Sequence, residues 1–370
     1  MNIQSAKDPK ADAGLFGAAG SPVSLPRVNV IVTCFNYERF VGEALDSVAA
    51  QSYRNFDCTV VDDASSDGSF DAVERWIGNR GDARFKLIRN ERNLGQMGSI
   101  IVALRATEGE FVALLDADDI WFADFLMRHI EVHLNRFRTS GASCSDLVQI
   151  DAKGHTLAGT ALPPFVLGDA NPRDKGDPVS ETDIPVLDSA PGSDQRARMP
   201  VRYVHADLGR WYWSVASGMV FRRQLVEVLI PDNAEPLRLG ADFYLMALAH
   251  AFTGSFAIDI PLGAYRRHGE NNFANLPVLG TGGLAPLEAT ATNVYNVYRT
   301  MMEHLLNANA RISKVFSPAL VRLRVRALFR VLLQMGFAFD DPRLAGIVGQ
   351  GRLKRDRMRA KIGFLRRRLI

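Results

Sequence analysis

Residues 111–119 read FVALLDADD, a run of five apolar residues followed by three aspartates within four positions. A short continuous apolar run bounded by polar residues indicates a strand that is buried on both faces of a sheet. The aspartates follow this run directly, so they lie where the chain leaves the sheet. This junction of a buried strand and an acidic turn indicates both the fold class and the place of a functional site.

The same arrangement recurs on both sides of this stretch. Further strands are predicted at 28–32, 56–61, 85–88 and 142–149. Amphipathic helices are predicted between them, at 38–52, 69–79, 97–107 and 122–137. This alternation is typical of an α/β fold with a mostly parallel sheet that helices cover on both faces. Ligands bind to such sheets beyond the carboxyl ends of the strands, so the polar residues that follow the strands are expected to meet there.

Carboxylates follow two of these strands: Asp62 and Asp63 after the second, and Asp116 and Asp118 after the fourth, with Asp119 beside them. Carboxylates on one edge repel one another unless a cation or hydrogen-bond donors offset their charge. Mg²⁺ and Mn²⁺ prefer such oxygen ligands and would keep positions open for a diphosphate. Acidic residues of loops also cap helices, and Asp119 taken alone fits a helix start equally well.

Four motifs stand in order along the chain: VNVIVTCFNY at 28–37, VVDDAS at 60–65, NLG at 93–95 and LDADD at 115–119. Together they resemble glycosyltransferase family 2, whose members have the Rossmann-like GT-A fold. The resemblance is strong over about 28–137 and weaker to about 272. It implies a metal-dependent, inverting enzyme that moves a sugar from a nucleoside diphosphate, with UDP the expected nucleotide, to an acceptor hydroxyl in surface polysaccharide or glycolipid assembly.

The resemblance also assigns roles on the donor side. Thr33 and Phe35 would line the nucleotide pocket, with Phe35 against the base. Asp63 would accept a hydrogen bond from the base, which favours uracil. Asn93 and Gly95 would let the backbone approach the nucleotide.

The metal and the diphosphate have their own implied residues. Asp116 would lie near the ribose and the metal, and Asp118 would be the principal ligand of Mg²⁺ or Mn²⁺. The stretch YRRHGENN at 265–272 resembles a loop that closes over the diphosphate. Arg266 and Arg267 would grip phosphate oxygens, because guanidinium groups bind them in a bidentate way. His268 would complete the metal shell, although a single histidine is more often structural.

The catalytic base is implied by GADF at 240–243, which takes the place of an acidic motif at a helix start. Ala241 replaces the first acid of that motif, so Asp242 alone would serve as the base. The alternative is that Asp242 caps the helix, since aspartate favours N-cap positions.

The charge is unevenly distributed along the chain. Residues 350–370 contain nine Lys or Arg and one Asp, which is +8, so the other 349 residues carry about −5 out of a total of +3. A mildly acidic body disfavours nucleic acid as a partner. The basic tail alternates cations with apolar residues, which fits either peripheral contact with an anionic membrane or a helix that packs on the body or on a partner.

These patterns predict several regions. We expect a disordered leader at 1–26 and a GT-A domain at 27–280, with a nucleotide-sugar-binding half at 27–137, a loop or insertion at 151–200 and an acceptor half at 201–280. A helical extension at 281–349 and the basic amphipathic tail at 350–370 follow. Three widely spaced cysteines, and the lack of a run of 18 apolar residues, favour a cytoplasmic protein without a transmembrane helix.

Two other functions share parts of this pattern. A nucleotidyltransferase would carry a Gly-rich, basic phosphate loop after its first strand, where TCFNY stands at 33–37. A catalytically silent sugar-binding or scaffold protein on the same fold is supported by Ala241 alone. A dinucleotide-dependent oxidoreductase is disfavoured, because no G-x-G-x-x-G follows the first strand. The expected partners are a nucleotide-sugar donor and a saccharide or lipid-linked acceptor.

Overall fold

The computed structural model describes residues 24–135, 137–161, 177–180, 184, 200–208, 211, 213–269, 271 and 287–367. The leader predicted at 1–26 lies outside the described residues except for its last three. Much of the segment 151–200 lies outside them as well.

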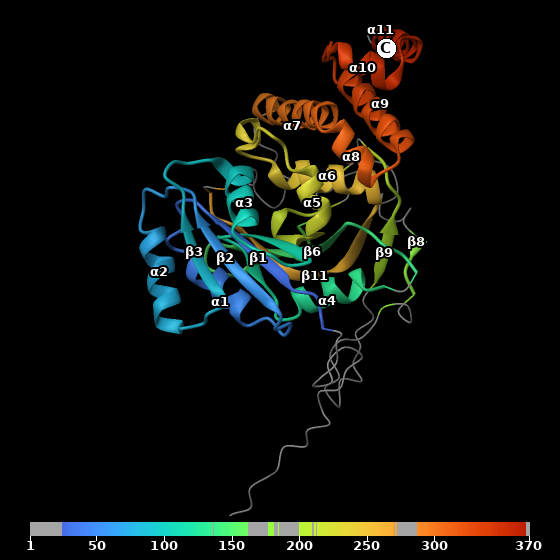
Figure 1. Ribbon diagram of the computed structural model, residues 1–370. Coiled ribbons are helices and arrows are strands. Elements are labelled where there is room, and N and C mark those ends of the chain that lie inside the picture. The colour runs from blue at the N-terminus through green and yellow to red at the C-terminus, as the bar shows by residue number, and fades with distance from the viewer. Residues whose placement is uncertain are drawn as a thin grey trace, which may run out of the picture.

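One mixed sheet of eleven strands forms the centre of the described molecule, in the order β3-β2-β1-β4-β10-β6-β11-β9-β8 (Figure 1). The first half of the chain contributes β1 (Val28–Cys34), β2 (Phe56–Asp62), β3 (Phe85–Arg89), β4 (Phe111–Asp116) and β6 (Ala142–Asp151) to this path. The others on this path are β8 (Asp177–Pro178), β9 (Val201–Val204), β10 (Met219–Arg222) and β11 (Ser255–Arg267). Two short strands lie beside it: β5 (Ile120–Trp121) pairs with β11, and β7 (Thr156–Ala158) pairs with β6.

The predicted α/β class is confirmed, and the five predicted strands appear as β1, β2, β3, β4 and β6. Their neighbours differ from a simple sequential sheet, because β10 lies between β4 and β6 and runs antiparallel to both. All three apolar residues of β10 are fully buried, so this strand fills the middle of the sheet. The segment 151–200 also differs from the predicted loop, since it contributes β7 and β8.

Helices cover both faces of the sheet, as predicted. On one face lie α1 (Val41–Ala49), α2 (Ser69–Arg80) and α4 (Phe125–His133), and on the other lie α3 (Gly95–Arg105), α5 (Arg223–Leu229) and α6 (Ala241–Thr253) (Figure 1). Strand β1 shows why both faces are apolar: Val30 and Val32 pack toward α1, and Ile31 packs toward α3. Alternate side chains of a strand point to opposite faces, so a strand covered on both sides is apolar throughout.

The last part of the described chain forms a helical cap above α6 (Figure 1). It consists of α7 (Leu287–Asn307), α8 (Asn309–Val315), α9 (Pro318–Gln334), α10 (Pro342–Val348) and α11 (Gln350–Arg367). Helix α7 packs on α6, α9 packs on α7, and α11 packs on α9. The predicted helical extension and basic tail therefore form one layered unit.

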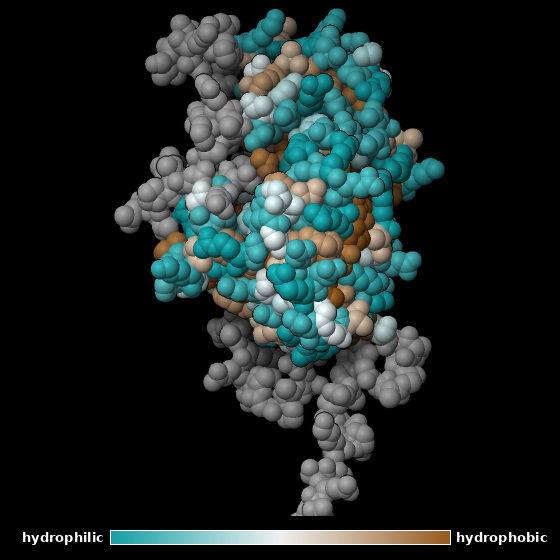
Figure 2. All heavy atoms as spheres, turned by 90° about the vertical axis from the view of Figure 1, so that its left-hand side faces the viewer, coloured by the Kyte–Doolittle hydropathy of each residue, from teal (hydrophilic) through white to brown (hydrophobic). Residues whose placement is uncertain are grey.

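The surface over the sheet and the cap is mainly hydrophilic on the side seen in Figure 2. No helix among the described residues is both long and apolar enough to cross a bilayer. The three cysteines are buried and unpaired, in agreement with the prediction that they form no disulfide.

Candidate functional site

The carboxyl ends of β1, β2 and β4 meet at one edge of the sheet. The parallel register places Thr33 beside Val61 on one side and beside Asp116 on the other. The hydroxyl of Thr33 donates a hydrogen bond to Oδ1 of Asp116 over 3.1 Å. The structure thus brings together two site residues that lie 83 positions apart in the sequence.

The turns that follow β1 and β2 hold each other in place. Asn36 and Ala64 both have left-handed backbone conformations, with φ of 61° and 58°. The amide N–H of Asn36 donates to Oγ of Ser65, and the N–H of Ser66 donates to Oδ1 of Asn36. These contacts fix the turn that presents Phe35, whose side chain lines a cavity and is 42% exposed.

Asp63 anchors the start of α3. Its carboxylate accepts hydrogen bonds from Nδ2 of Asn90 and from the backbone N–H groups of Leu94 and Gly95, over 2.7, 2.7 and 2.8 Å. An ionised carboxylate has about four acceptor positions, so one remains for a ligand. Gly95 has a φ of +75°, and a Cβ there would lie 2.4 Å from Cα of Arg238. A side chain at this position is excluded by the backbone of Arg238.

Asn93 connects this turn to the short 3₁₀ helix η4 (Glu235–Leu237) and the residue after it. Nη1 of Arg238 donates to the carbonyl oxygen of Asn93 over 3.0 Å, and Nη2 donates to its side-chain oxygen. Asn93, Gly95 and Arg238 all line the cavity.

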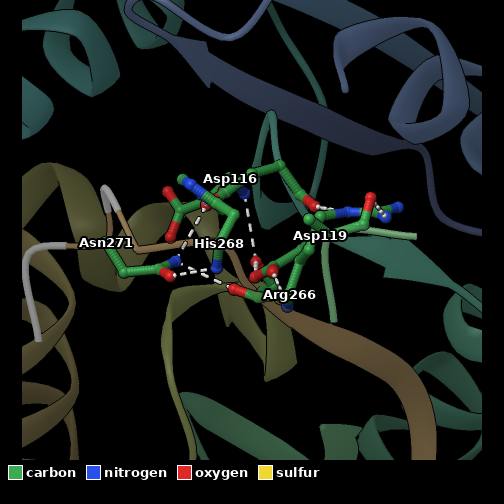
Figure 3. A network of polar contacts seen from close by, with 8 residues as sticks. Asp116, Asp119, Arg266, His268 and Asn271 are labelled. Atoms are coloured by element: carbon green, nitrogen blue, oxygen red, sulfur yellow. Dashed lines mark hydrogen bonds and ion pairs between the residues drawn. The ribbon is translucent and has the colours of Figure 1, made fainter. Parts of the chain in front are cut away.

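The aspartates of the acidic turn after β4 have separate partners, several of which are drawn in Figure 3. Oδ1 of Asp116 accepts from Nε2 of Gln96 over 3.1 Å, in addition to Thr33. Oδ2 of Asp118 lies 3.0 Å from Nε2 of His268 and accepts a longer hydrogen bond from Asn271. Asp116 and Asp118 both line the cavity.

Asp119 has a supporting position beneath this turn. It is fully buried and accepts from Oγ of Ser217 over 2.5 Å and from the backbone N–H of Arg266 over 2.8 Å. Oγ of Ser217 also accepts from the backbone N–H of Asp116. The interpretation of Asp119 as a helix-start residue is wrong, because α4 begins at Phe125, with Asp124 before it.

Arg266 and Arg267 are the last two residues of β11 and are not among the residues that line the cavity. The side chain of Arg266 is buried, and it donates to the carbonyl oxygen of Asp118 over 2.8 Å and to Glu43 over 2.6 Å. Arg267 is half-buried and donates to Gln149. Arg266 thus bonds to the acidic turn (Figure 3), and phosphate binding by Arg266 or Arg267 stays a prediction.

Asp242 stands in the first turn of α6 and lines the cavity. The N-cap residue is Gly240, with a φ of +84°, so Asp242 is not at the N-cap position. Oδ1 of Asp242 does accept a hydrogen bond from the backbone N–H of Phe243 over 2.7 Å, so the side chain also bonds to the start of this helix. Ala241 is fully buried in the core, so its side chain faces away from the cavity that Asp242 lines.

The cavity has a volume of about 580 Å³, and most of the charged residues that line it are acidic. Burial, with the nearby charges of Asp118 and Asp242, raises the pKa of Asp116 to about 7. Burial also raises the pKa of Asp242. Eight of the residues singled out from the sequence line this cavity: Thr33, Phe35, Asp63, Asn93, Gly95, Asp116, Asp118 and Asp242.

Comparison with known proteins identifies the family. A profile described as "Glycosyl transferase family 2" matches residues 29–145. An uncharacterised glycosyltransferase of Nostoc sp. is 30% identical over 247 residues, which are 66% of this chain and 66% of that protein. The chain belongs to glycosyltransferase family 2.

Two further proteins resemble this glycosyltransferase. An Escherichia coli protein, named UDP-Glc:alpha-D-GlcNAc-diphosphoundecaprenol beta-1,3-glucosyltransferase WfgD, is 36% identical over 107 residues, 29% of this chain and 41% of that protein. The chain therefore spans about two thirds of the Nostoc relative and less than half of the E. coli one. The structure of Staphylococcus aureus TarS 1-349 in complex with UDP-GlcNAc has 15% identity, a coverage of 92% of each chain and a TM-score of 0.50. This similarity confirms the predicted GT-A fold.

Asp118 and His268 are donors of the kinds that divalent cations bind. Oδ2 of Asp118 lies 3.0 Å from Nε2 of His268, and both side chains are nearly buried. Among the described residues, however, no group of three or more His, Cys, Asp or Glu is close enough together to hold a metal. The structure therefore does not bring Asp116 together with Asp118 and His268 as a ligand set, and a cation at these residues stays a prediction.

Sequence reasoning missed several residues of this glycosyltransferase site. Gln96 and Ser217 position the acidic turn, and Arg238 holds the turn at Asn93. Asn293 and Asn296 of α7 line the cavity. The only signal for Ser217 is its place in SGMVFRR at 217–223, which resembles the acceptor-side strand of the family, and the α7 residues follow no motif.

Proposed function

We propose that this glycosyltransferase moves a sugar from a nucleoside diphosphate to an acceptor hydroxyl with inversion, and that UDP is the nucleotide. One observation carries the proposal: Phe35, Asp63, Asp116, Asp118 and Asp242 line a single cavity. Phe35 supplies an aromatic surface for the base, and Asp63 supplies a hydrogen-bond acceptor for it. Asp116 and Asp118 supply an acidic pair for a cation and its diphosphate, and Asp242 supplies a carboxylate for proton transfer.

On the donor side, Phe35 is an exposed aromatic ring at the mouth of the cavity, suited to stacking on a base. Asp63 has an acceptor position left for the imide N–H of uracil. A Mg²⁺ or Mn²⁺ ion at Asp116, Asp118 and His268 would neutralise charge on the diphosphate as it departs. Arg266 would keep the acidic turn in position, and Arg267 is the remaining arginine for phosphate contact.

On the acceptor side, Asp242 acts as the general base. It takes the proton of the acceptor hydroxyl while that oxygen forms a bond to the anomeric carbon, and the bond from this carbon to the diphosphate oxygen breaks on the opposite face. Such a displacement inverts the anomeric configuration. A carboxylate whose pKa is raised by burial is a stronger base than an exposed one, which favours this role near neutral pH.

The name of one relative supports a class of acceptor. The E. coli relative is named for a saccharide acceptor on a diphosphate lipid. We propose a saccharide or lipid-linked acceptor here as well, in the assembly of a surface polysaccharide or glycolipid.

The outward side of α11 in the helical cap is basic. Leu353 and Asp356 of α11 face α9, and Asp356 forms an ion pair with Arg326. The outward side of α11 carries Met358, 64% exposed, and a set of exposed cations. Those with described side chains are Arg352, Lys354, Arg355, Arg357, Arg359 and Lys361. We propose peripheral contact with anionic lipid on the inner face of the membrane through this side.

Vesicle sedimentation tests this contact. The triple variant Lys354→Glu, Arg355→Glu, Arg359→Glu should no longer pellet with anionic vesicles, while Lys86→Glu, an exposed residue of β3, should pellet like the wild type. Equal pelleting of the triple variant and the wild type would contradict the membrane proposal.

A thermal-shift screen of nucleotide-sugars with Mn²⁺ tests the proposed reaction, because a ligand that binds only the folded state raises its melting temperature. At least one UDP-sugar should stabilise the wild type only with the metal, and Asp118→Ala should lose this effect. The stabilising sugar should then be transferred to a glycoside acceptor with inverted configuration. Metal-dependent stabilisation without any transfer or hydrolysis would instead favour a silent sugar-binding protein.

A further inference from the structure

Helix α7 forms a wall of the cavity through Asn293 and Asn296. Residues three apart on a helix lie on the same face, so the two amides are neighbours. Among the described residues, neither side-chain amide has a hydrogen-bond partner, and both are only partly exposed. Polar groups that line a cavity without a protein partner are available to a ligand.

The two amides are held close to Asp242. A Cβ built on Gly240 would lie 3.3 Å from Cγ2 of Val297, so α7 packs directly on the residue two positions before Asp242. Val297 follows Asn296 and lies one helical turn beyond Asn293. Asn293, Asn296 and Asp242 thus line one cavity, and α7 contacts the turn that precedes Asp242.

The charge of this region limits what binds there. The described cavity lining contains five carboxylates, those of Asp63, Asp116, Asp118, Asp242 and Glu235. A single cation, Arg238, belongs to the same described lining, and it is already bonded to Asn93. The positive charge of a cation at Asp118 would be balanced by the negative charge of the donor's own diphosphate. Arg238 also lies 3.8 Å from Glu235, so it offsets part of that charge, whereas no such cation accompanies Asp242 in the described lining. An anionic group beside Asp242 would therefore meet like charge.

We propose that Asn293 and Asn296 bind hydroxyl groups of the acceptor, and that the acceptor unit at this wall is a neutral saccharide. An amide offers both donors and an acceptor, which matches hydroxyls that donate and accept in turn. The inference rests on the proposed function. The acceptor is favoured over the donor sugar because α7 packs on the turn that precedes Asp242, and the base must lie within hydrogen-bond reach of the acceptor hydroxyl.

The test uses matched neutral and charged glycosides as probes. The neutral probes are the 4-nitrophenyl glycosides of glucose, galactose, mannose and N-acetylglucosamine, and the charged ones are the glucuronide and galacturonide. Binding is measured by calorimetry and by saturation-transfer NMR, with and without UDP and Mn²⁺. The proteins are the wild type, Asn293→Ala/Asn296→Ala, and Thr292→Ala, whose side chain is exposed on the same helix.

The wild type should bind at least one neutral glycoside about tenfold more tightly than its uronide. The double variant should bind that glycoside about tenfold or more weakly, since each lost hydrogen bond contributes a few-fold to tenfold in affinity. Thr292→Ala should match the wild type, and UDP affinity should stay the same in all three proteins.

Each of these results from the glycoside measurements would overturn the inference: a uronide that binds as tightly as its neutral counterpart, a double variant that binds the glycoside like the wild type, or no binding of any glycoside. A double variant that loses UDP affinity would also overturn it, because the wall would then serve the donor. If UDP fails to bind even the wild type, the proposed function fails, while the glycoside comparison without nucleotide still decides the inference.

Discussion

Replacing Asp116 by asparagine should stabilise the metal-free protein at alkaline pH. Burial, with the charges of Asp118 and Asp242, raises the pKa of Asp116 from 3.8 to about 7. The folded state therefore holds this proton more tightly than the unfolded chain does, and the free energy of unfolding falls as the pH rises between about 4 and 7. The destabilisation that comes from ionising Asp116 in the folded state is absent below about pH 4 and complete above about pH 7.

The magnitude follows from the size of this pKa shift. A shift of about three units corresponds to about 4 kcal/mol, at about 1.4 kcal/mol per unit. Asparagine keeps an oxygen for the hydrogen bonds from Thr33 and Gln96, although bonds to a neutral acceptor are weaker by about 1 kcal/mol. We expect Asp116→Asn to raise the free energy of unfolding by about 3 kcal/mol at pH 8 and to have no stabilising effect at pH 4.

Guanidinium unfolding followed by tryptophan fluorescence, in EDTA at pH 4, 6 and 8, measures this difference. Glu74→Gln, at an exposed position of α2, controls for the loss of one charge and should change stability little at any pH. Adding Mn²⁺ with UDP should stabilise the wild type and not Asp116→Asn. A stability difference between Asp116→Asn and the wild type that is the same at pH 4 and pH 8 would refute the argument.

Three further substitutions test the supports of the site. Gly95→Ala should lower the free energy of unfolding by about 1–3 kcal/mol, because Gly95 has a φ of +75° and the new Cβ would lie 2.4 Å from the backbone of Arg238. The control Gly78→Ala, in open space on α2, should raise it by up to about 1 kcal/mol; thermal melting measures both. Ser217→Ala should cost about 1–3 kcal/mol and raise the KM for the donor, since it removes the hydroxyl that ties the acidic turn together; an unchanged KM would contradict that positioning role. Arg326→Met should cost about 2–3 kcal/mol at pH 7, because it removes two hydrogen bonds to the buried Asp356 and leaves the longer ion pair with Arg330, at 3.9 Å. The ion pair with Arg326 lowers the pKa of Asp356, so its contribution should be lost as the pH falls below about 4, and Arg326→Met should then resemble the wild type.

The first half of the fold was predictable because its signals are local. Strand β4 begins with a continuous apolar run, and β1 to β3 are short, mostly apolar segments that are each followed by polar residues. Parallel strands place their carboxyl ends at one edge, so Thr33 and Asp116 were expected there. These residues of the cavity could therefore be placed from the sequence, whereas Gln96 and Arg238 could not.

The second half depends on contacts between distant segments. Nothing local to β10 indicates that it inserts between β4 and β6, since any short apolar strand could take an edge or a centre. The sequence also gives no direction for the side chain of Arg266, which turns inward to Glu43 instead of toward the cavity. The cavity wall on α7 was missed because two asparagines at helical spacing resemble any solvated helix face.

The rate and nucleotide affinity of Asp242→Asn test the central claim most directly. The side chain keeps its size and loses its ability to take a proton, so kcat for transfer should fall by about 10²–10⁴-fold. The affinity for UDP in the presence of Mn²⁺, measured by calorimetry, should stay within about twofold of the wild type, because Asp242 is proposed to contact the acceptor and not the nucleotide. Transfer at the wild-type rate by Asp242→Asn would contradict the account.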